Sequence, residues 1–336
     1  MNRLLKSPLS GIIPPLVTPL LDDDTLDVRG LECLIERLID GGVNALFILG
    51  TTGEAQCLSY KLRAEMIRET CRITADRLPV LVCISDTSIV ESVRLAQVAA
   101  NYGAEAVVSA PPYYFASAQP ELVEFYDKLI KDLPLPLFLY NMPTHTKVNF
   151  APQTIYRIAE NPKVIGFKDS SANLVYFQSV MHIMKDHPNF SMLVGPEEVT
   201  GEVVPAGKKY TDVKMLTKGK LLLAGGWAVG QMIEGLERGV DCFMPTAMHE
   251  IYVRIYTLFQ EGHKTAAREL FERILPILSY SNQHLDISIH FFKEMMYSLG
   301  IYETNMVREP IIALDAINHK ITDELIERYK VIRDSL

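Results

Sequence analysis

The chain lacks the sequence features that membrane and exported proteins need. Its longest uninterrupted apolar runs, among them Ala45–Leu49 and Leu135–Tyr140, have only 5 to 7 residues, whereas a transmembrane helix needs roughly 18 or more. Arg3, Lys6 and Pro8 stand where a secretory signal would have its apolar stretch. We therefore expect a cytoplasmic protein that does not span a membrane.

Basic charge and cysteine are also scarce. Lys and Arg number 33 against 41 Asp and Glu, which gives a net charge of −8. An acidic protein repels phosphate backbones, so we expect no nucleic-acid partner. The five cysteines form no CxxC pair and are predicted to be small buried hydrophobes in a reducing compartment, with a catalytic or ligand role as the alternative. They are Cys33, Cys57, Cys71, Cys83 and Cys242.

Motifs for metals and nucleotides are missing. His249 and Glu250 begin an HExxH pattern, but Val253 stands where the second histidine is needed. Residues 201–208 have one residue too many for a Walker loop, and the glycines of 225–230, interpreted as a helix start, lack Rossmann spacing. We therefore predict no metal and no cofactor.

Short apolar strand patterns recur along the chain, with amphipathic helical patterns between them. Hydrophobic residues make up 48% of the chain and charged residues 22%, as in ordinary globular proteins. Most of the strand patterns begin 27 to 34 residues after the preceding one, which is the length of one βα unit. The eight candidates begin at Ile12, Ala45, Pro79, Ala106, Pro136, Val164, Ser191 and Asp241.

This alternation predicts an α/β protein with parallel strands, specifically a (β/α)8 TIM barrel at 1–262. A doubly wound open sheet is the structural alternative. Helical patterns at 266–278, 287–299 and 323–332 predict a helical C-terminal extension, 263–336, packed on the barrel. The last interval is too long, and its excess, a lysine-rich insertion at about 196–226, is predicted to be a solvated loop or hairpin, with a lid or oligomer contact as the alternative.

In a parallel barrel the reactive side chains lie at the carboxyl ends of the strands. Lys168 follows Val164, Ile165 and Phe167 in a strand expected to be buried on both faces, where an unpaired ammonium is costly. Desolvation lowers the pKa of such an amine, and the neutral amine attacks a carbonyl to form a Schiff base. A simple ion pair with Asp169 is the alternative for Lys168.

Two other strand ends carry groups suited to the same chemistry. Tyr140 ends the preceding strand, and its phenol is a candidate proton shuttle; a structural tyrosine bonded to a backbone carbonyl is the alternative. Thr51 and Thr52 lie between Gly50 and Gly53, in a turn whose hydroxyl and N–H groups suit a carboxylate. Such glycine and threonine residues also cap many helices.

Four motifs, in this order over roughly residues 10 to 300, resemble the dihydrodipicolinate synthase and N-acetylneuraminate lyase family of class I, Schiff-base pyruvate enzymes. They are GTTGE at 50–54, PPYY at 111–114, YNMP at 140–143 and GFKDSS at 166–171. The resemblance implies that Lys168 forms the imine and Tyr140 is the general acid and base. It also implies that Thr51 and Thr52 bind the carboxylate of the 2-oxo acid and join the proton relay.

The resemblance extends to partners and to the rest of the pocket. One of Tyr113 and Tyr114, in the first instance Tyr114, resembles a tyrosine that neighbouring subunits exchange, and family members are commonly dimers of dimers. Gly195 and Phe243 fall where the family lines the pyruvate pocket with main chain and an apolar side chain. These positions predict a homo-oligomer with a small-molecule 2-oxo acid as ligand.

The loop after the YNMP motif departs from the synthase branch. His145 stands where that branch usually has an arginine for the carboxylate of the aldehyde substrate, and Lys147 stands where a glycine is common. A neutral imidazole cannot make the charged fork of a guanidinium, although Lys147 or the insertion could supply a charge, and His145 is equally readable as a solvated loop residue. The departures favour the branch that acts on sugar-derived 2-oxo acids.

We therefore predict a cofactor-independent lyase that acts on pyruvate or a 2-oxo-3-deoxy acid, with an aldehyde as the second reactant, by aldol reaction or dehydration. A non-catalytic barrel that binds a 2-oxo acid is the alternative from another class. Within the family, a true 4-hydroxy-tetrahydrodipicolinate synthase and an N-acetylneuraminate lyase remain open.

Overall fold

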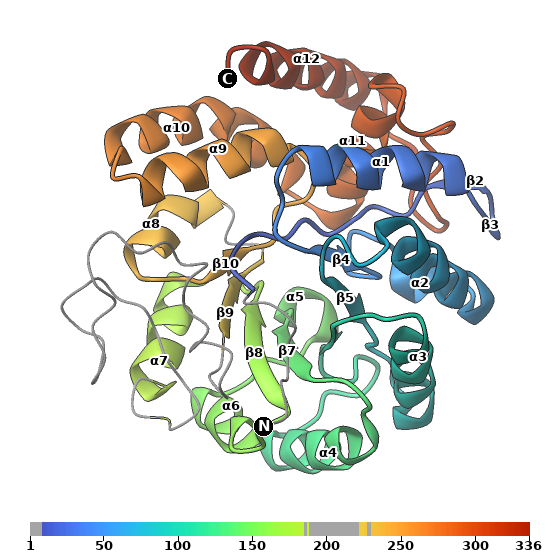
Figure 1. Ribbon diagram of the computed structural model, residues 1–336, viewed down its shortest axis with the longest axis vertical. Helices are drawn as coiled ribbons and strands as arrows, with labels where there is room; N and C mark the ends of the chain where they lie inside the picture. The colour runs from blue at the N-terminus through green and yellow to red at the C-terminus, as the bar shows by residue number, and fades with distance from the viewer. Residues whose placement is uncertain (1–8, 185–186, 188–221, 227–229) are drawn as a thin grey trace. The chain divides into compact units, whose positions relative to one another are not determined.

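The computed structural model describes residues 9–184, 187, 222–226 and 230–336 (Figure 1). Gly195 and all but the last residues of the predicted insertion lie outside this part of the chain. The chain divides into two compact units: Leu81–Met244 with the first ten residues, and Gly11–Val80 with Pro245–Leu336. The predicted boundary at residue 262 stays a prediction.

The first unit contains a parallel sheet whose strands follow one another in chain order. Every residue of β6, β7 and β8 is buried, as expected for a parallel sheet covered on both faces. Each strand pairs with the next along the chain, from Leu81 of β5 to β10. The strands are β5 (Val80–Cys83), β6 (Ala106–Ser109), β7 (Leu137–Asn141), β8 (Val164–Asp169), β9 (Leu222–Gly225) and β10 (Cys242–Phe243).

Helices follow these strands and cover the sheet; Figure 1 shows α3, α4, α6 and α7 on its outer side. α3 begins after Ser88, whose hydroxyl accepts a hydrogen bond from the backbone of Glu91. α5 and α6 begin with Pro143 and Pro152, because proline is favoured in a first helical turn. The helices are α3 (Ile89–Asn101), α4 (Gln119–Asp132), α5 (Pro143–Thr146), α6 (Pro152–Ala159), α7 (Leu174–Met184) and α8 (Met232–Glu237).

The second unit joins the N-terminal strands to the C-terminal helices. Pro15 and Phe47 form a parallel bridge beside β1 and β4. α10, α11 and α12 confirm the three helices predicted near the C-terminus, and α9 contacts both β1 and α10. The elements are β1 (Gly11–Ile12), β2 (Leu20–Asp22), β3 (Thr25–Leu26), α1 (Val28–Asp40), β4 (Leu46–Ile48), η1 (Ala55–Cys57), α2 (Tyr60–Thr74), α9 (His249–Gln260), α10 (Lys264–Ser281), α11 (Leu285–Ser298) and α12 (Ala316–Arg333).

The seventh strand was predicted at Ser191, which lies outside the described residues. Among the described residues, β9 is the strand that pairs with both β8 and β10. Gly225, interpreted from the sequence as part of a helix start, instead ends β9. The sequence pattern did not single out residues 222–225 as a strand, because a short apolar run does not by itself distinguish a strand from a helix.

The cysteines were only partly as predicted. Cys83 and Cys242 are buried in strands, whereas Cys71 is partly exposed and Cys33 and Cys57 are exposed. Cys33 lies on α1 between the positions that face the core, so its helical phase turns it outward. Within the described residues, no helix has both the length and the apolar character of a membrane span.

Candidate functional site

Tyr140 and Lys168 are direct neighbours across β7 and β8. The parallel register pairs the two residues, and the Nζ atom of Lys168 lies 4.1 Å from the centroid of the Tyr140 ring. They lie 28 residues apart in the chain, and the βαβ crossover brings the two strand ends side by side. The structure therefore brings together the two residues expected to carry the chemistry.

Burial makes the Lys168 amine a nucleophile near neutral pH. Only 4% of the residue is exposed, and burial lowers the pKa of Lys168 to about 7, although the thiols of Cys83 and Cys242 act in the opposite direction. At neutral pH a large fraction of the amine is therefore unprotonated, as attack on a carbonyl requires. Adjacent residues of a strand point to opposite faces, so Lys168 and Asp169 face different sides of the sheet.

The main chain at Gly226 lies close to the side chain of Lys168. Its N–H donates a hydrogen bond to the carbonyl of Asp169 at 2.8 Å. A Cβ atom at this position would lie 1.9 Å from the Ser170 hydroxyl and 2.8 Å from Cε of Lys168. Only glycine fits, so the described structure supplies a main-chain position beside the lysine that the sequence analysis had missed. The sequence analysis had assigned a main-chain role in the pocket to Gly195, which lies outside the described residues.

Asn141 and Asp169 occupy the next register position, on the opposite face of the sheet. The Nδ2 atom of Asn141 donates to Oδ1 of Asp169 at 2.9 Å. The backbone and hydroxyl of Ser171 also donate to this carboxylate, at 3.1 and 2.9 Å. Burial raises the pKa of Asp169, and these hydrogen bonds act against that shift. Their geometry links the ends of the two strands that carry Tyr140 and Lys168.

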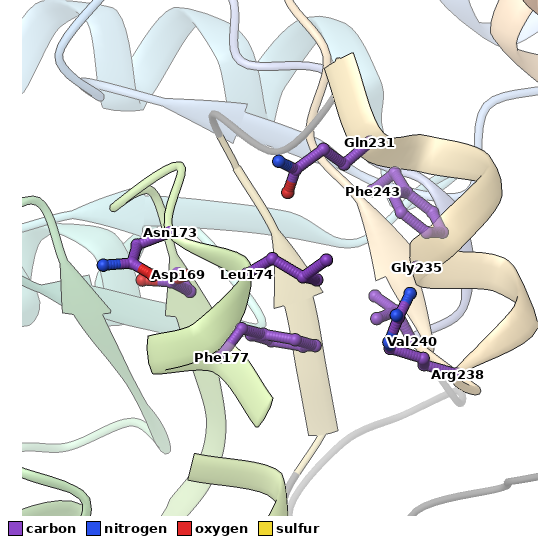
Figure 2. Close-up of a pocket in the computed structure, with 9 residues that line it drawn as sticks. All are labelled: Asp169, Asn173, Leu174, Phe177, Gln231, Gly235, Arg238, Val240 and Phe243. Carbon is purple, nitrogen blue, oxygen red and sulfur yellow. The ribbon is translucent and has the colours of Figure 1, made fainter. Parts of the chain in front are cut away.

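Phe243, which was predicted to line the pyruvate pocket, lies one register position beyond the level of Lys168. The register aligns Cys242 with Lys168 through Ala224, and aligns Phe243 with Asp169 through Gly225. Because side chains alternate along a strand, Phe243 faces the helices. Its ring packs against Gly235 of α8 and lines a pocket between α7 and α8, where Figure 2 shows it opposite Leu174 and Phe177.

Tyr113, Tyr114 and His145 lie in the segments after β6 and β7. Tyr114 is 79% exposed, and its ring makes an edge contact with Phe115 at a centroid distance of 4.8 Å. Tyr113 and His145 are partly exposed. Lys147 has a φ of 59°, a left-handed conformation that favours glycine. The Lys147 ammonium donates to the carbonyl of Thr144 at 2.6 Å.

Thr51 and Thr52 belong to the second unit, in a tight turn after β4. The N–H of Gly53 donates to the carbonyl of Gly50, and the Thr18 hydroxyl donates to the carbonyl of Gly53 at 2.7 Å. The two threonines are partly exposed. The Oγ1 atom of Thr52 lies 3.4 Å from that of Thr246, a residue after β10 to which the sequence analysis had given no role.

Comparison with known proteins identifies a matching family and several similar enzymes. Residues 8–211 match the dihydrodipicolinate synthetase family. The probable 2-dehydro-3-deoxy-D-pentonate aldolase YjhH of Escherichia coli K12 is 31% identical over 270 residues, or 80% of each chain. A 4-hydroxy-tetrahydrodipicolinate synthase of Herminiimonas arsenicoxydans is 33% identical over 212 residues, which cover 59% of this chain and 73% of that protein.

A solved structure described as dihydrodipicolinate synthase from Bacteroides thetaiotaomicron is 50% identical, with a TM-score of 0.81. The match covers 96% of this chain and 99% of that one. The fold is thus the predicted TIM barrel with its C-terminal helical extension. The relatives are synthases and aldolases, so the prediction of a lyase is confirmed as well. The chain belongs to the dihydrodipicolinate synthetase family.

Proposed function

We propose that this lyase forms a Schiff base between Lys168 and the ketone of pyruvate or of a 2-oxo-3-deoxy acid. The observation that carries the proposal is the buried amine of Lys168, whose pKa is lowered to about 7 by burial. It lies beside the ring of Tyr140. A buried, partly neutral amine at a strand end is suited to attack on a carbonyl carbon.

In the proposed reaction the amine nitrogen attacks C2 of the 2-oxo acid, and the carbonyl oxygen gains a proton. Loss of water then gives a protonated imine. In the cleavage direction the C3–C4 bond breaks, its electron pair moves into the imine to form an enamine, and the C4 hydroxyl loses its proton to become an aldehyde. Protonation at C3 and hydrolysis release pyruvate and the free amine.

Tyr140 and the two threonines complete this proposal. We assign the proton transfers at the carbinolamine and at the C4 hydroxyl to the phenol of Tyr140. Thr51 and Thr52 would bind the substrate carboxylate through hydroxyl and backbone N–H groups. The turn that carries them is held by hydrogen bonds from Gly53 and Thr18, which supports a preorganised anion site.

For the second reactant we propose an aldehyde derived from a sugar acid. The support is His145, which cannot supply the permanent charge that an arginine would give a dicarboxylate substrate, together with the likeness to the pentonate aldolase. Dihydrodipicolinate synthesis is the second candidate, favoured by the 50% identity to the Bacteroides structure. Assays with 2-oxo-3-deoxy sugar acids, and with pyruvate plus aspartate semialdehyde, would distinguish the two reactions.

Borohydride reduction in the presence of pyruvate tests the central step. We expect a reduced pyruvyl adduct on the peptide that contains Lys168, and neither adduct nor activity in Lys168→Ala. Tyr140→Phe should retain the adduct while turnover falls roughly 10²- to 10⁴-fold. An unmodified Lys168 peptide, or activity that survives Lys168→Ala, would refute the proposal.

We also propose that the protein is a cytoplasmic homotetramer. Exposure of Tyr114 and Phe115, at 79% and 78%, supports a role for this loop in contacts between subunits. Light scattering after gel filtration should give the mass of a tetramer, and Tyr114→Ala should shift it toward smaller species. Cell fractionation tests the location.

A further inference from the structure

Glu54, the last residue of the GTTGE turn, is buried and has an uncommon backbone conformation. It is 4% exposed and has a φ of 57°, in the left-handed region that few residues other than glycine adopt. Its N–H donates to the carbonyl of Thr51 at 3.1 Å. The position of Glu54 is therefore coupled to the backbone that carries the two threonines.

The C-terminal helical region supplies the partner of this carboxylate. Nζ of Lys293, on α11, lies 2.5 Å from Oε2 of Glu54, and each side chain is 1% exposed. The backbone N–H of Arg308 donates to Oε1 of Glu54 at 2.8 Å. Lys293 also donates to the carbonyl of Met306 at 2.5 Å. Both oxygens of the carboxylate are thus engaged by residues far along the chain.

Stability alone is a weak reason for such a pair. Removing two charges from water is costly, and apolar residues of similar size often serve as well for stability. Burial lowers the pKa of Lys293, and the Glu54 carboxylate opposes that shift. What the pair provides is a fixed anchor at the end of a short polar turn, because a charged partner constrains the carboxylate more narrowly than apolar packing.

We propose that Glu54 and Lys293 are positioning residues that hold the Thr51–Thr52 turn in the geometry that binds the carboxylate of the 2-oxo acid. The inference rests on the proposed function and extends it to the C-terminal helices. The C-terminal region then determines substrate affinity through α11, and neither Glu54 nor Lys293 touches the reacting atoms. Loss of the pair should weaken binding of the 2-oxo acid without preventing imine formation.

The test uses Lys293→Met and Glu54→Gln in the full-length protein, with the borohydride reaction at Lys168 as readout. In both variants we expect the pyruvate concentration for half-maximal modification to rise about tenfold or more, and the maximal rate to change less than about threefold. Lys330→Met is the matched control, because it removes a more exposed Lys–Glu pair on α12, Lys330 with Glu327 at 2.7 Å. The control should behave as the wild type.

The double variant tests whether the two residues act together. If they form one anchor, it should raise the half-maximal concentration no further than the worse single variant. Glu54→Gln keeps the side-chain volume and an acceptor for the Arg308 N–H, so it decides the question if Lys293→Met folds poorly. Folded variants with wild-type half-saturation would overturn this inference alone, whereas a wild-type protein without any adduct would overturn the proposed function.

Discussion

Asn141 and Asp169 are hydrogen-bonded across β7 and β8, one register position after Tyr140 and Lys168. Asn141 is fully buried, and its amide also donates to Oδ1 of Asn149 and accepts from the N–H of Phe150. Tyr140 and Lys168, the side chains proposed to do the chemistry, lie on one face of the sheet. The side-chain hydrogen bonds that link the ends of β7 and β8 lie on the other face.

Replacing Asn141 should therefore affect both stability and catalysis. Asn141→Ala leaves the Phe150 N–H and part of the Asp169 carboxylate without partners, which should lower the free energy of unfolding by about 2 kcal/mol or more. We also expect slower turnover, because the strand end that carries Tyr140 loses its hydrogen bond to β8. Urea unfolding and steady-state kinetics measure the two effects. Asn149→Ala is the matched control; an equal loss in both variants would argue against a special role for Asn141.

Lys168→Met should make the protein more stable near neutral pH. The pKa of the amine is about 7 in the folded protein, against 10.5 for an ordinary lysine. Between these values the unfolded chain binds more protons, so wild-type stability rises with pH. We expect the variant to exceed the wild type by on the order of a few kcal/mol below pH 7, and less as pH rises toward 10. Urea titrations at several pH values measure this difference, and a gap independent of pH would contradict the burial argument.

Reaction with pyruvate should depend on the same titration. Only the neutral amine attacks, so the rate of borohydride-dependent modification at low pyruvate should fall about tenfold per pH unit below pH 7 and level off above it. The modification rate between pH 5 and 9 gives the profile. An inflection near 10 would mean that Lys168 is an ordinary solvated lysine.

Gly226→Ala should inactivate the enzyme. The added Cβ would meet the Ser170 hydroxyl, Cε of Lys168 and the carbonyl of Asp169, at 1.9, 2.8 and 3.1 Å. We expect a loss of at least about 100-fold in activity, since small displacements at a reacting centre are costly. Gly230→Ala is the control, because among the described residues, apart from its chain neighbours, no atom lies within 4 Å of its Cβ position. Near-normal activity of Gly226→Ala would show that Ser170 and Lys168 can move away from the added methyl group without loss of function.

The sequence was sufficient to predict the barrel and the pair of Tyr140 and Lys168, because parallel strands end at one edge and a lysine in a buried strand is unusual. It did not determine which face of the sheet Phe243 occupies. In a strand of two residues, the sequence pattern does not show which residue points to which face. Glu54 belonged to a motif, but its anchor could not be inferred. The Arg308 bond spans 254 residues, and no local pattern reports such contacts.

Cys242 lies in line with Lys168 across the sheet, and burial raises the pKa of its thiol well above the ordinary value. A thiol that stays mostly uncharged favours the ammonium form of the neighbouring Lys168 less than an acidic residue there would. For an engineer who wants this barrel to accept other ketones or to work at another acidity, strand β10 therefore offers a position for tuning the nucleophile without replacing it.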